Sequence, residues 1–366
     1  MSAELIHALE QLEKEKGINK EFLIDAIEAA LMSAYKKNFG PTQNVRINID
    51  RSTGEVKVFA LKRVTSNPEN ETSDISIEAA LKINNRVEEE DTIEIEVTPR
   101  KFGRIAAQAA KQVVVQRIKE AERNLIFEEF YNKEGDIVSG LIQRYDKKNI
   151  IIDLGKVEAM LLASEQTPGE EYNYNDRIKA YVVQVKKTTK GPQIFVSRTH
   201  PGLVKRLFEL EVPEIHDGVV EIKGISREPG SRTKIAVFSK EENVDPVGAC
   251  VGHKGIRVQA VVDELRGEKI DIIKWSTKPS EFILSSLSPA KVLRVDTNEN
   301  EKSARVVVPD YQLSLAIGKE GQNARLSAKL TGWKIDIKSE SQLRTEIEKQ
   351  FFNVDTVYES DSEEEE

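Results

Sequence analysis

The first third of the chain alternates between helical and strand patterns of apolar residues. From Phe22 to Tyr35 the apolar residues recur with a period near 3.6, which predicts an amphipathic helix. Residues 45–49 and 56–59 then alternate between apolar and polar positions on either side of a short polar turn, as the two strands of a hairpin do. We therefore expect residues 1–131 to form an α/β domain.

A further alternating strand at residues 93–97 leads into a long helical pattern that ends at Phe130. Thr98 fits the N-cap of this helix, and Pro99 fits its first position. A basic stripe is expected along one face of the helix, formed by Arg100, Arg104 and Lys111. A solvated face is the plain interpretation of this stripe, and a surface for RNA phosphate is the alternative.

The next segment, residues 132–200, contains five short strand patterns separated by turn signals. They lie at residues 137–142, 149–154, 158–162, 177–185 and 194–197. The segments at 135–140, 153–155 and 196–198 resemble the S1 variety of OB barrel, a fold that commonly binds single strands. The middle strands offer no aromatic platform for a base, and Tyr145 is the only candidate nearby. A weak RNA contact and a spacer therefore both remain possible roles for this barrel.

One short motif occurs twice in the last part of the chain. The copies are Gly252-His253-Lys254-Gly255 and Gly318-Lys319-Glu320-Gly321. Glycine at both ends of a loop permits positive φ and close approach of another backbone, and the following helix directs its free N–H groups to that place. A single Gly-x-x-Gly is usually a turn between helices. Two copies with matching flanks favour the KH module, which clamps about four nucleotides of single-stranded RNA.

Each copy of the motif lies in a segment with the element order α-β-β-α-α-β. The segments span residues 201–275 and 276–340, and their order is that of the prokaryotic (type II) KH domain. Because only residues 271–278 join them, we expect the two modules to pack as one rigid unit with both loops along a shared face.

The charge of the chain is unevenly distributed. The formal net charge is −8, and residues 341–366 alone carry −7. This last segment is predicted to be a largely disordered acidic tail. Solvation is its default role, and a decoy that competes with RNA is the hypothesis of interest. The KH segments are nearly neutral, so the affinity of each module for RNA should be modest and depend on avidity.

Few residues suggest chemistry beyond binding. The single cysteine, Cys250, lies among small apolar residues and is expected to be a packed thiol in a reducing compartment. The four histidines show no ligand spacing, and no segment has the length or composition of a membrane span or signal peptide. We therefore expect a cytoplasmic protein with no metal and no cofactor.

Longer segments resemble the NusA family of bacterial transcription elongation, termination and antitermination factors. They include Glu211-Val212-Pro213-Glu214-Ile215, Arg227-Glu228-Pro229-Gly230-Ser231-Arg232, Asp245-Pro246-Val247-Gly248-Ala249-Cys250-Val251-Gly252, and Ala316-Ile317-Gly318-Lys319 with Gly321-Gln322-Asn323. The resemblance covers about residues 1–340. The family's further carboxy-terminal acidic repeats are missing here, so any regulation by them is not expected.

The resemblance implies that the amino-terminal domain docks on RNA polymerase near the RNA exit channel, while the S1 and KH domains hold the nascent RNA. It implies a monomer that works with other termination and antitermination factors. The implied hairpin contacts are Lys36, Lys37, Arg104 and Lys111. The implied single-strand contacts are the two glycine loops together with Arg257, Gln322, Asn323 and Arg325.

Two other classes of protein fit parts of the sequence. A general or ribosome-associated single-stranded RNA-binding protein would carry the same modules. An RNA-degrading enzyme of the phosphorolytic type also carries KH and S1 modules, but in the opposite order and beside large catalytic domains. Residues 1–131 show no catalytic carboxylate pair, Walker loop or nucleophile-base pair. The sequence therefore predicts a binding factor and not an enzyme.

Overall fold

The computed structural model describes residues 2–40, 44–68, 70, 72–84, 86–100 and 102–349. The chain divides into two compact units, Met1–Ile126 and Phe127–Glu366. Each unit has its own core and is described by itself. Within the described residues, no helix combines the length and the apolar character that crossing a bilayer requires.

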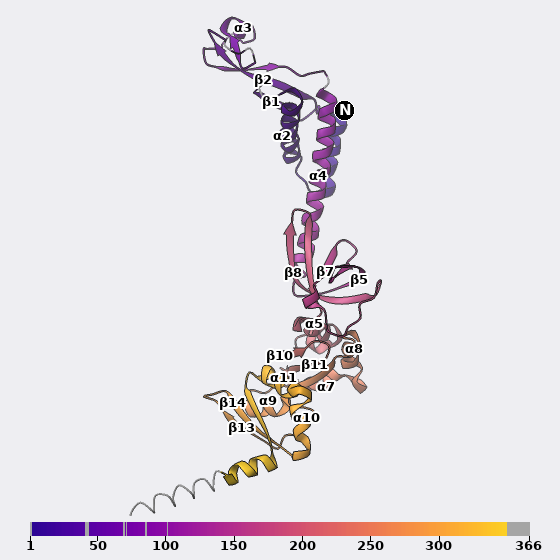
Figure 1. The fold of residues 1–366 in the computed structure, drawn as a ribbon. Coiled ribbons are helices and arrows are strands. Elements are labelled where there is room, and N and C mark those ends of the chain that lie inside the picture. Colours follow the sequence, from indigo (N-terminus) through magenta and orange to yellow (C-terminus); the bar gives the residue numbers. More distant parts are fainter. Residues whose placement is uncertain are drawn as a thin grey trace, which may run out of the picture. The chain divides into compact units, whose positions relative to one another are not determined.

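The first unit is a small mixed sheet with helices packed on it (Figure 1). Its elements are α1 (Ser2–Lys16), α2 (Lys20–Phe39), β1 (Val45–Ile49), β2 (Val56–Thr65), β3 (Asp74–Ser76), α3 (Ile77–Leu81), β4 (Thr92–Glu96) and α4 (Phe102–Tyr131). Strand β2 is central, because it pairs with β1 and β4 antiparallel and with β3 parallel. The predicted hairpin of β1 and β2 is therefore confirmed.

The core of the first unit lies between the helices and the hairpin. Leu23, Ile27 and Leu31 of α2 are fully buried, and they pack with the inward residues of β1 and with Phe102 of α4. Helix α2 begins where the side chain of Asn19 accepts hydrogen bonds from the first free N–H groups. The apolar period of α2 thus fixes which of its faces meets the sheet.

Helix α4 begins later than its sequence predicts. The first helical residue is Phe102, so the expected N-cap at Thr98 and first position at Pro99 were wrong. The hydroxyl of Thr98 instead accepts a hydrogen bond from the backbone N–H of Val58 in β2 (3.0 Å). Arg100 consequently lies before the helix and is not part of its basic stripe.

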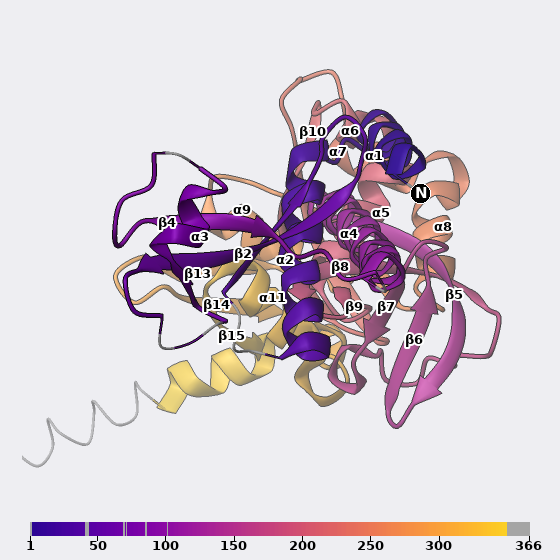
Figure 2. The ribbon, with the colours of Figure 1, turned by 90° about the horizontal axis from the view of Figure 1, so that it is seen from above.

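The second unit starts with a closed five-stranded barrel, as predicted. Its strands are β5 (Ile137–Asp146), β6 (Asn149–Asp153), β7 (Glu158–Leu161), β8 (Arg177–Thr188) and β9 (Gly191–Ser197), with the short helix η1 (Ala163–Glu165) after β7. The pairing order is β5-β6-β7-β9-β8, and the neighbouring strands β5 and β6 can be followed in Figure 2. Alternating residues such as Ile150 and Ile152 fill the barrel interior.

The two repeats follow, and both contain the predicted order of elements, with a short extra helix, α6, in the first. The first contains α5 (Pro201–Glu211), α6 (Pro213–His216), β10 (Val220–Glu228), β11 (Arg232–Ser239), α7 (Pro246–Val251), η2 (His253–Gly255), α8 (Ile256–Glu264) and β12 (Lys269–Lys274). The second contains α9 (Pro279–Ser286), β13 (Arg294–Asn298), β14 (Ser303–Val308), η3 (Asp310–Gln312), α10 (Leu313–Ile317), η4 (Lys319–Gly321), α11 (Gln322–Thr331) and β15 (Lys334–Ser339). In each sheet one pair is antiparallel and one is parallel.

The two repeats pack against each other through an apolar contact. Helix α11 of the second repeat lies against β10 and β11 of the first (Figure 1). Ala236 and Ile273 of the first sheet join Phe282 of α9 and Leu330 of α11 in one cluster, with Trp275 beside them. Helices of the second repeat therefore cover one face of the first sheet, which makes the repeats one packed body.

The chain continues as a helix beyond the second repeat. Residues 340–349 are helical, and Glu346 pairs with Lys338 of β15 (2.5 Å). The start of the predicted tail is therefore ordered against the second repeat. The rest of the predicted acidic tail, residues 350–366, lies outside the described residues.

Candidate nucleic-acid interface

The two glycine loops have the same backbone conformation. Gly252 and Gly318 end the preceding helices with φ, ψ of 74°, 175° and 78°, 170°. The third loop residues, Lys254 and Glu320, are both left-handed, at 51°, 26° and 51°, 29°. Because glycine occupies the other positive-φ positions, the local sequence selects this shape twice. The repeat seen in the sequence is thus a repeat in three dimensions.

The first glycine of each loop is also required by packing. A Cβ at Gly252 would lie 2.7 Å from Cγ of Arg257, and one at Gly318 would lie 2.8 Å from the backbone nitrogen of Asn323. Each glycine therefore lets the first turn of the following helix close over the loop. A larger residue would have to displace that turn.

The loops present exposed side chains to solvent at the starts of two helices. Neither α8 nor α11 has a side-chain N-cap among the described residues, and their first N–H groups, those of Ile256 and Gln322, donate to the loop carbonyls of His253 and Lys319. His253, Lys254, Lys319 and Glu320 are all exposed. A helix start of this kind suits a phosphate. Lys254 adds a positive charge to the first loop, whereas Glu320 adds a negative charge to the second.

Arg257 and Asn323 occupy equivalent positions in the two repeats, and both turn back toward the preceding helix. The guanidinium of Arg257 donates to the carbonyl of Ala249 (2.6 Å) and pairs with Glu214 (2.9 Å). The amide of Asn323 donates to the carbonyls of Ala316 and Leu287 (both 3.0 Å). Asn323 is only 3% exposed, so its predicted contact with RNA was wrong. Both side chains instead satisfy carbonyl groups of their surroundings.

Gln322 and Arg325 do not point freely into solvent. The amide of Gln322 donates to Glu228 (2.8 Å) and to the hydroxyl of Ser231 (2.7 Å) in the first repeat. Nε of Arg325 donates to the same Glu228 (2.7 Å). This hydrogen bond from Arg325 holds the pKa of Glu228 below its usual value, so the carboxylate is charged at neutral pH. The start of α11 is therefore tied to the first repeat.

A buried charge cluster joins the two repeats as well. Nζ of Lys234 is fully buried and donates to Asp271 (3.0 Å) and to the carbonyl of Ser288 in the second repeat (2.8 Å). Arg232 forms two further hydrogen bonds with Asp271 (2.7 and 2.9 Å). Burial lowers the pKa of Lys234. Although burial would raise the pKa of Asp271, hydrogen bonds from Arg232 and Lys234 keep it below its usual value.

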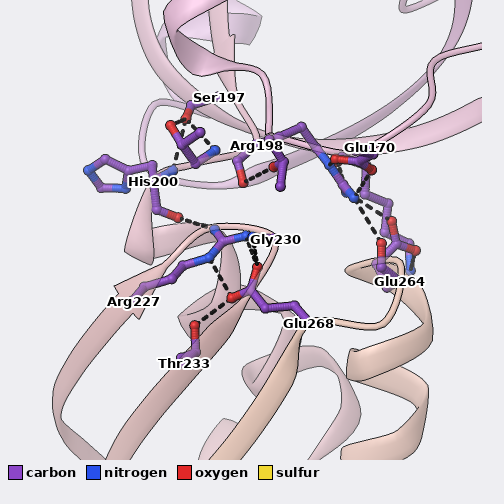
Figure 3. Close-up of polar contacts among 12 residues, drawn as sticks. Glu170, Ser197, Arg198, His200, Arg227, Gly230, Thr233, Glu264 and Glu268 are labelled. Carbon is purple, nitrogen blue, oxygen red and sulfur yellow. Dashed lines mark hydrogen bonds and ion pairs between the residues drawn. The ribbon is translucent and has the colours of Figure 1, made fainter. Parts of the chain in front are cut away.

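A second buried network joins the barrel to the first repeat (Figure 3). Glu268 accepts two hydrogen bonds from Arg227 (both 2.9 Å), one from the backbone N–H of Gly230 (2.9 Å) and one from Thr233 (2.5 Å). The side chains of Arg227 and Glu268 are 1% and 0% exposed. Arg227 also donates to the carbonyl of His200 at the end of the barrel segment (3.0 Å). Each side-chain nitrogen and carboxylate oxygen of this pair thus has a hydrogen-bond partner within the protein.

Arg198 extends the junction on its other side, as Figure 3 shows. It forms an ion pair with Glu170 of the barrel, and its guanidinium donates to the carbonyl of Glu264 in α8 (2.9 Å). Tyr172 donates to the same Glu170 (2.9 Å), and burial raises the pKa of Tyr172 to about 12. Arg198 therefore has a structural role at the junction and no free face for RNA.

The outer surface of the barrel carries a platform that the sequence did not reveal. Met160 of β7 pairs with Phe195 of β9, and Nζ of Lys186 lies 5.1 Å from the centre of the Phe195 ring. A groove of about 360 Å³ runs beside them and is lined by Ile151, Met160 and Pro192, among others. Tyr145, the predicted candidate, is exposed and donates its hydroxyl to the carbonyl of Tyr172.

Of the predicted basic residues of the first unit, Lys36, Lys37 and Arg104 lie where α2 ends and α4 begins, whereas Lys111 lies further along α4, beside Leu9 and Gly54. The ring of Tyr35 lies 5.7 Å from that of Phe102, so the last turn of α2 meets the first turn of α4. Lys36, Lys37, Arg104 and Lys111 are exposed, and none of them has an ion-pair partner among the described residues. At the helix C-terminus, Lys36 and Lys37 also stabilise the α2 dipole.

The single cysteine and the possible metal ligands show no sign of reactive chemistry among the described residues. Cys250 is fully buried in the core of the first repeat, and burial raises the pKa of its thiol to about 12. The thiol is therefore protonated at neutral pH, as expected for a packed residue. The described residues contain no cluster of ligand side chains that could hold a metal ion.

A closed OB barrel, joined by buried polar contacts to the first of two packed modules with matching glycine loops, defines a class of protein: multi-module RNA-binding proteins of the S1 and KH type. Comparison with domain families agrees. The NusA N-terminal domain matches residues 4–124, the S1 RNA binding domain 131–197, and the NusA-like first and second KH domains 198–275 and 279–345.

Whole-length relatives give the same result. The chain is 61% identical over 344 residues to the transcription termination/antitermination protein NusA of Bacillus subtilis, covering 94% of this chain and 93% of that protein. It is 60% identical over 342 residues to the NusA of Halalkalibacterium halodurans (93% and 90%), and 43% identical over 346 residues to that of Thermus thermophilus (92% and 89%). The chain belongs to the NusA family.

Membership confirms the predicted family, fold class and kind of activity. The relatives are named as transcription termination/antitermination proteins, and the matched domains are RNA-binding domains. This supports the expectation of a transcription factor and not an enzyme.

Proposed function

We propose that the protein is a transcription elongation factor that binds RNA polymerase near the RNA exit channel and holds the nascent RNA. In this role it modulates pausing, termination and antitermination, in the cytoplasm, as a monomer and together with other such factors. The observation that carries the proposal is the pair of loops with one backbone conformation, built into one packed body with an OB barrel.

The single-strand contacts are assigned to the two loops. Gly252, Gly255, Gly318 and Gly321 supply the close backbone approach, and the N-termini of α8 and α11, which have no side-chain cap, direct the positive ends of their helix dipoles toward the phosphate. The bound RNA strand would be flanked by the middle residues of the two loops, His253, Lys254, Lys319 and Glu320. Gln322 and Arg325 would lie beside it at the second loop. Arg257 acts from behind the first loop by fixing its shape. We propose that both loops lie along a shared face, so that one RNA reaches both.

The barrel supplies a further RNA contact in this proposal. A base that stacks on Phe195 would displace the Lys186 ammonium from the face of the ring, and that ammonium could then meet a phosphate next to the groove at Met160. Lys187 and Lys190 continue the positive charge toward the tip of the β8–β9 hairpin, and both are exposed. Each KH module carries little net charge and should bind RNA weakly by itself. Linked weak contacts of the barrel and the two KH modules would together give a higher affinity for one RNA strand.

The first unit supplies the polymerase contact in this proposal. An apolar cavity of about 600 Å³ opens between α1, α4 and the β1–β2 turn, with Leu9, Val56 and Ala106 among its lining residues. Such a cavity suits apolar side chains of a protein partner. Lys36, Lys37, Arg104 and Lys111 would then face an RNA hairpin as it emerges.

We keep the domain limits that the sequence predicts. They are 1–131 for the polymerase-binding domain, 132–200 for the S1 domain, 201–275 and 276–340 for the two KH domains, and 341–366 for the tail. No helix or strand of the described chain is cut by these limits, apart from the terminal helix that crosses into the tail segment.

The polymerase contact is tested by a pull-down. Immobilised residues 1–131 are expected to capture core RNA polymerase of a close relative such as Bacillus subtilis, because this fragment contains the complete first unit and its core. A fragment of residues 132–349 is the matched control and should capture little polymerase in the absence of RNA. Capture by the control fragment alone would contradict the proposal and favour a free RNA-binding protein.

A further inference from the structure

The turn between β10 and β11 touches all three RNA-binding modules. Its residues are Glu228, Pro229, Gly230 and Ser231. On the barrel side, a Cβ at Gly230 would lie 2.6 Å from the carbonyl oxygen of Pro168. Within the first KH module, the N–H of Gly230 donates to Glu268 (2.9 Å). On the side of the second KH module, Glu228 and Ser231 accept the hydrogen bonds from α11.

The part of the second module that this turn holds is the part next to its glycine loop. Gln322 and Arg325 lie in the first turn of α11, directly after Gly321. Arg325 also donates to the carbonyl of Glu320 within the loop (3.1 Å). One guanidinium therefore bridges the loop of the second module and the carboxylate of Glu228 in the first.

Within the described part of the chain, the first module shows no such attachment at the equivalent positions. Ile256 occupies the place of Gln322 and is 64% exposed. Gln259 occupies the place of Arg325 and donates to Asp263 within its own helix (2.8 Å). The attachment is consequently a specific property of the second loop and not a general feature of the module.

Charge indicates what the attachment does. Arg325 is a cation next to a loop that carries both Lys319 and Glu320, and Glu228 neutralises Arg325. An RNA phosphate that approaches this loop meets two carboxylates, the exposed Lys319 and a guanidinium that is already paired. The Arg325 side chain is 58% exposed, so it can reach a phosphate without unfolding of its surroundings.

We propose that Glu228 is a positioning residue that holds Arg325 in the RNA-free protein and sets the RNA affinity of the second KH loop. On binding, the N–H of Arg325 exchanges the carboxylate of Glu228 for a phosphate oxygen, and no covalent bond changes. The inference rests on the proposed RNA-binding function. In this proposal, RNA binding at the second loop changes the contacts of the β10–β11 turn. Because that turn also contacts the barrel and the first module, both would respond to RNA at the second loop.

The test is a mutant cycle with the full chain. Glu228→Gln, Arg325→Gln and the double variant are titrated with an unstructured single-stranded RNA of about twelve nucleotides, three times what one KH module clamps, at one fixed salt concentration. Glu228→Gln is expected to raise affinity about fivefold when Arg325 is present and less than about twofold when it is absent. Glu221→Gln is the matched control.

The control removes an equal charge from the same strand. Glu221 is 34% exposed, against 30% for Glu228, and it pairs with Lys223 and Lys240 instead of a loop residue. It should leave RNA affinity unchanged. Unchanged or lower affinity of Glu228→Gln, or an equal gain in both Arg325 backgrounds, would overturn the proposal. If the unaltered chain and the Glu221→Gln control bind no RNA, the proposed function itself fails, and the role of Glu228 fails with it.

Discussion

Replacing Glu268 by alanine is expected to lower the free energy of unfolding of the second unit by about 3–5 kcal/mol. The change leaves the buried guanidinium of Arg227 without its carboxylate, and the N–H of Gly230 and the hydroxyl of Thr233 lose an acceptor. Urea unfolding followed by tryptophan fluorescence measures this effect, because the chain's two tryptophans, Trp275 and Trp333, both lie in the KH modules.

Two further variants make that measurement specific. Glu221→Gln removes two solvent-accessible ion pairs, with Lys223 and Lys240, and should change the free energy of unfolding far less than Glu268→Ala does. The double variant Arg227→Met/Glu268→Gln removes the unpaired charge and keeps an acceptor for Gly230, so it should lose less stability than Glu268→Ala. A loss below about 1 kcal/mol for Glu268→Ala would show that this pair does not hold the junction.

Lys254→Glu is expected to weaken binding of single-stranded RNA about tenfold, whereas Glu320→Lys is expected to strengthen it by a similar factor. Both residues are exposed and have the same left-handed backbone, so neither exchange alters strain or packing. The gain from Glu320→Lys should not depend on RNA sequence, because a phosphate contact carries no sequence information. Fluorescence anisotropy with RNAs of different sequence measures both effects.

A neutral substitution separates charge from shape in this experiment. Lys254→Gln keeps the length of the side chain and should fall between the unaltered chain and Lys254→Glu. Equal RNA affinity of the unaltered chain, Lys254→Glu and Glu320→Lys would refute the assignment of the loops as phosphate contacts.

Much of the fold could be predicted because local signals repeat in the sequence. The two glycine loops, the alternating strands and the helix periods all depend on residues close together in the chain. Asp245 and Pro246, for example, mark the start of α7, and Gly252 marks its end. Two copies of such a pattern identify a module even when one copy alone would be ambiguous.

The junctions between modules could not be predicted, since they depend on residues far apart in the chain. Arg227 and Glu268 look like surface charges in the sequence, yet both are buried and paired. Arg198 likewise meets Glu170 and Glu264 only after the barrel and the first KH module have folded. Nothing in the local sequence distinguishes a buried ion pair from a solvated one.

The same reason explains the errors at single residues. Thr98 is a residue type that suits an N-cap, but its hydroxyl accepts a hydrogen bond from the N–H of Val58 in a distant strand. Asn323 is a residue type that suits an RNA contact, but its amide donates to the carbonyls of Leu287 and Ala316. Phe195 was not considered among the aromatic residues of the barrel surface, because only the pairing of β9 with β7 places it beside Met160. In each case a tertiary partner decided the role.

The most direct test of the central claim is to map where nascent RNA touches the full chain. A stalled elongation complex carrying a photoreactive transcript is mixed with the protein, irradiated, and analysed by mass spectrometry for RNA adducts. The account predicts adducts at residues 252–255 and 318–321 from the same transcript. Adducts confined to other surfaces, or none on the KH modules, would contradict it.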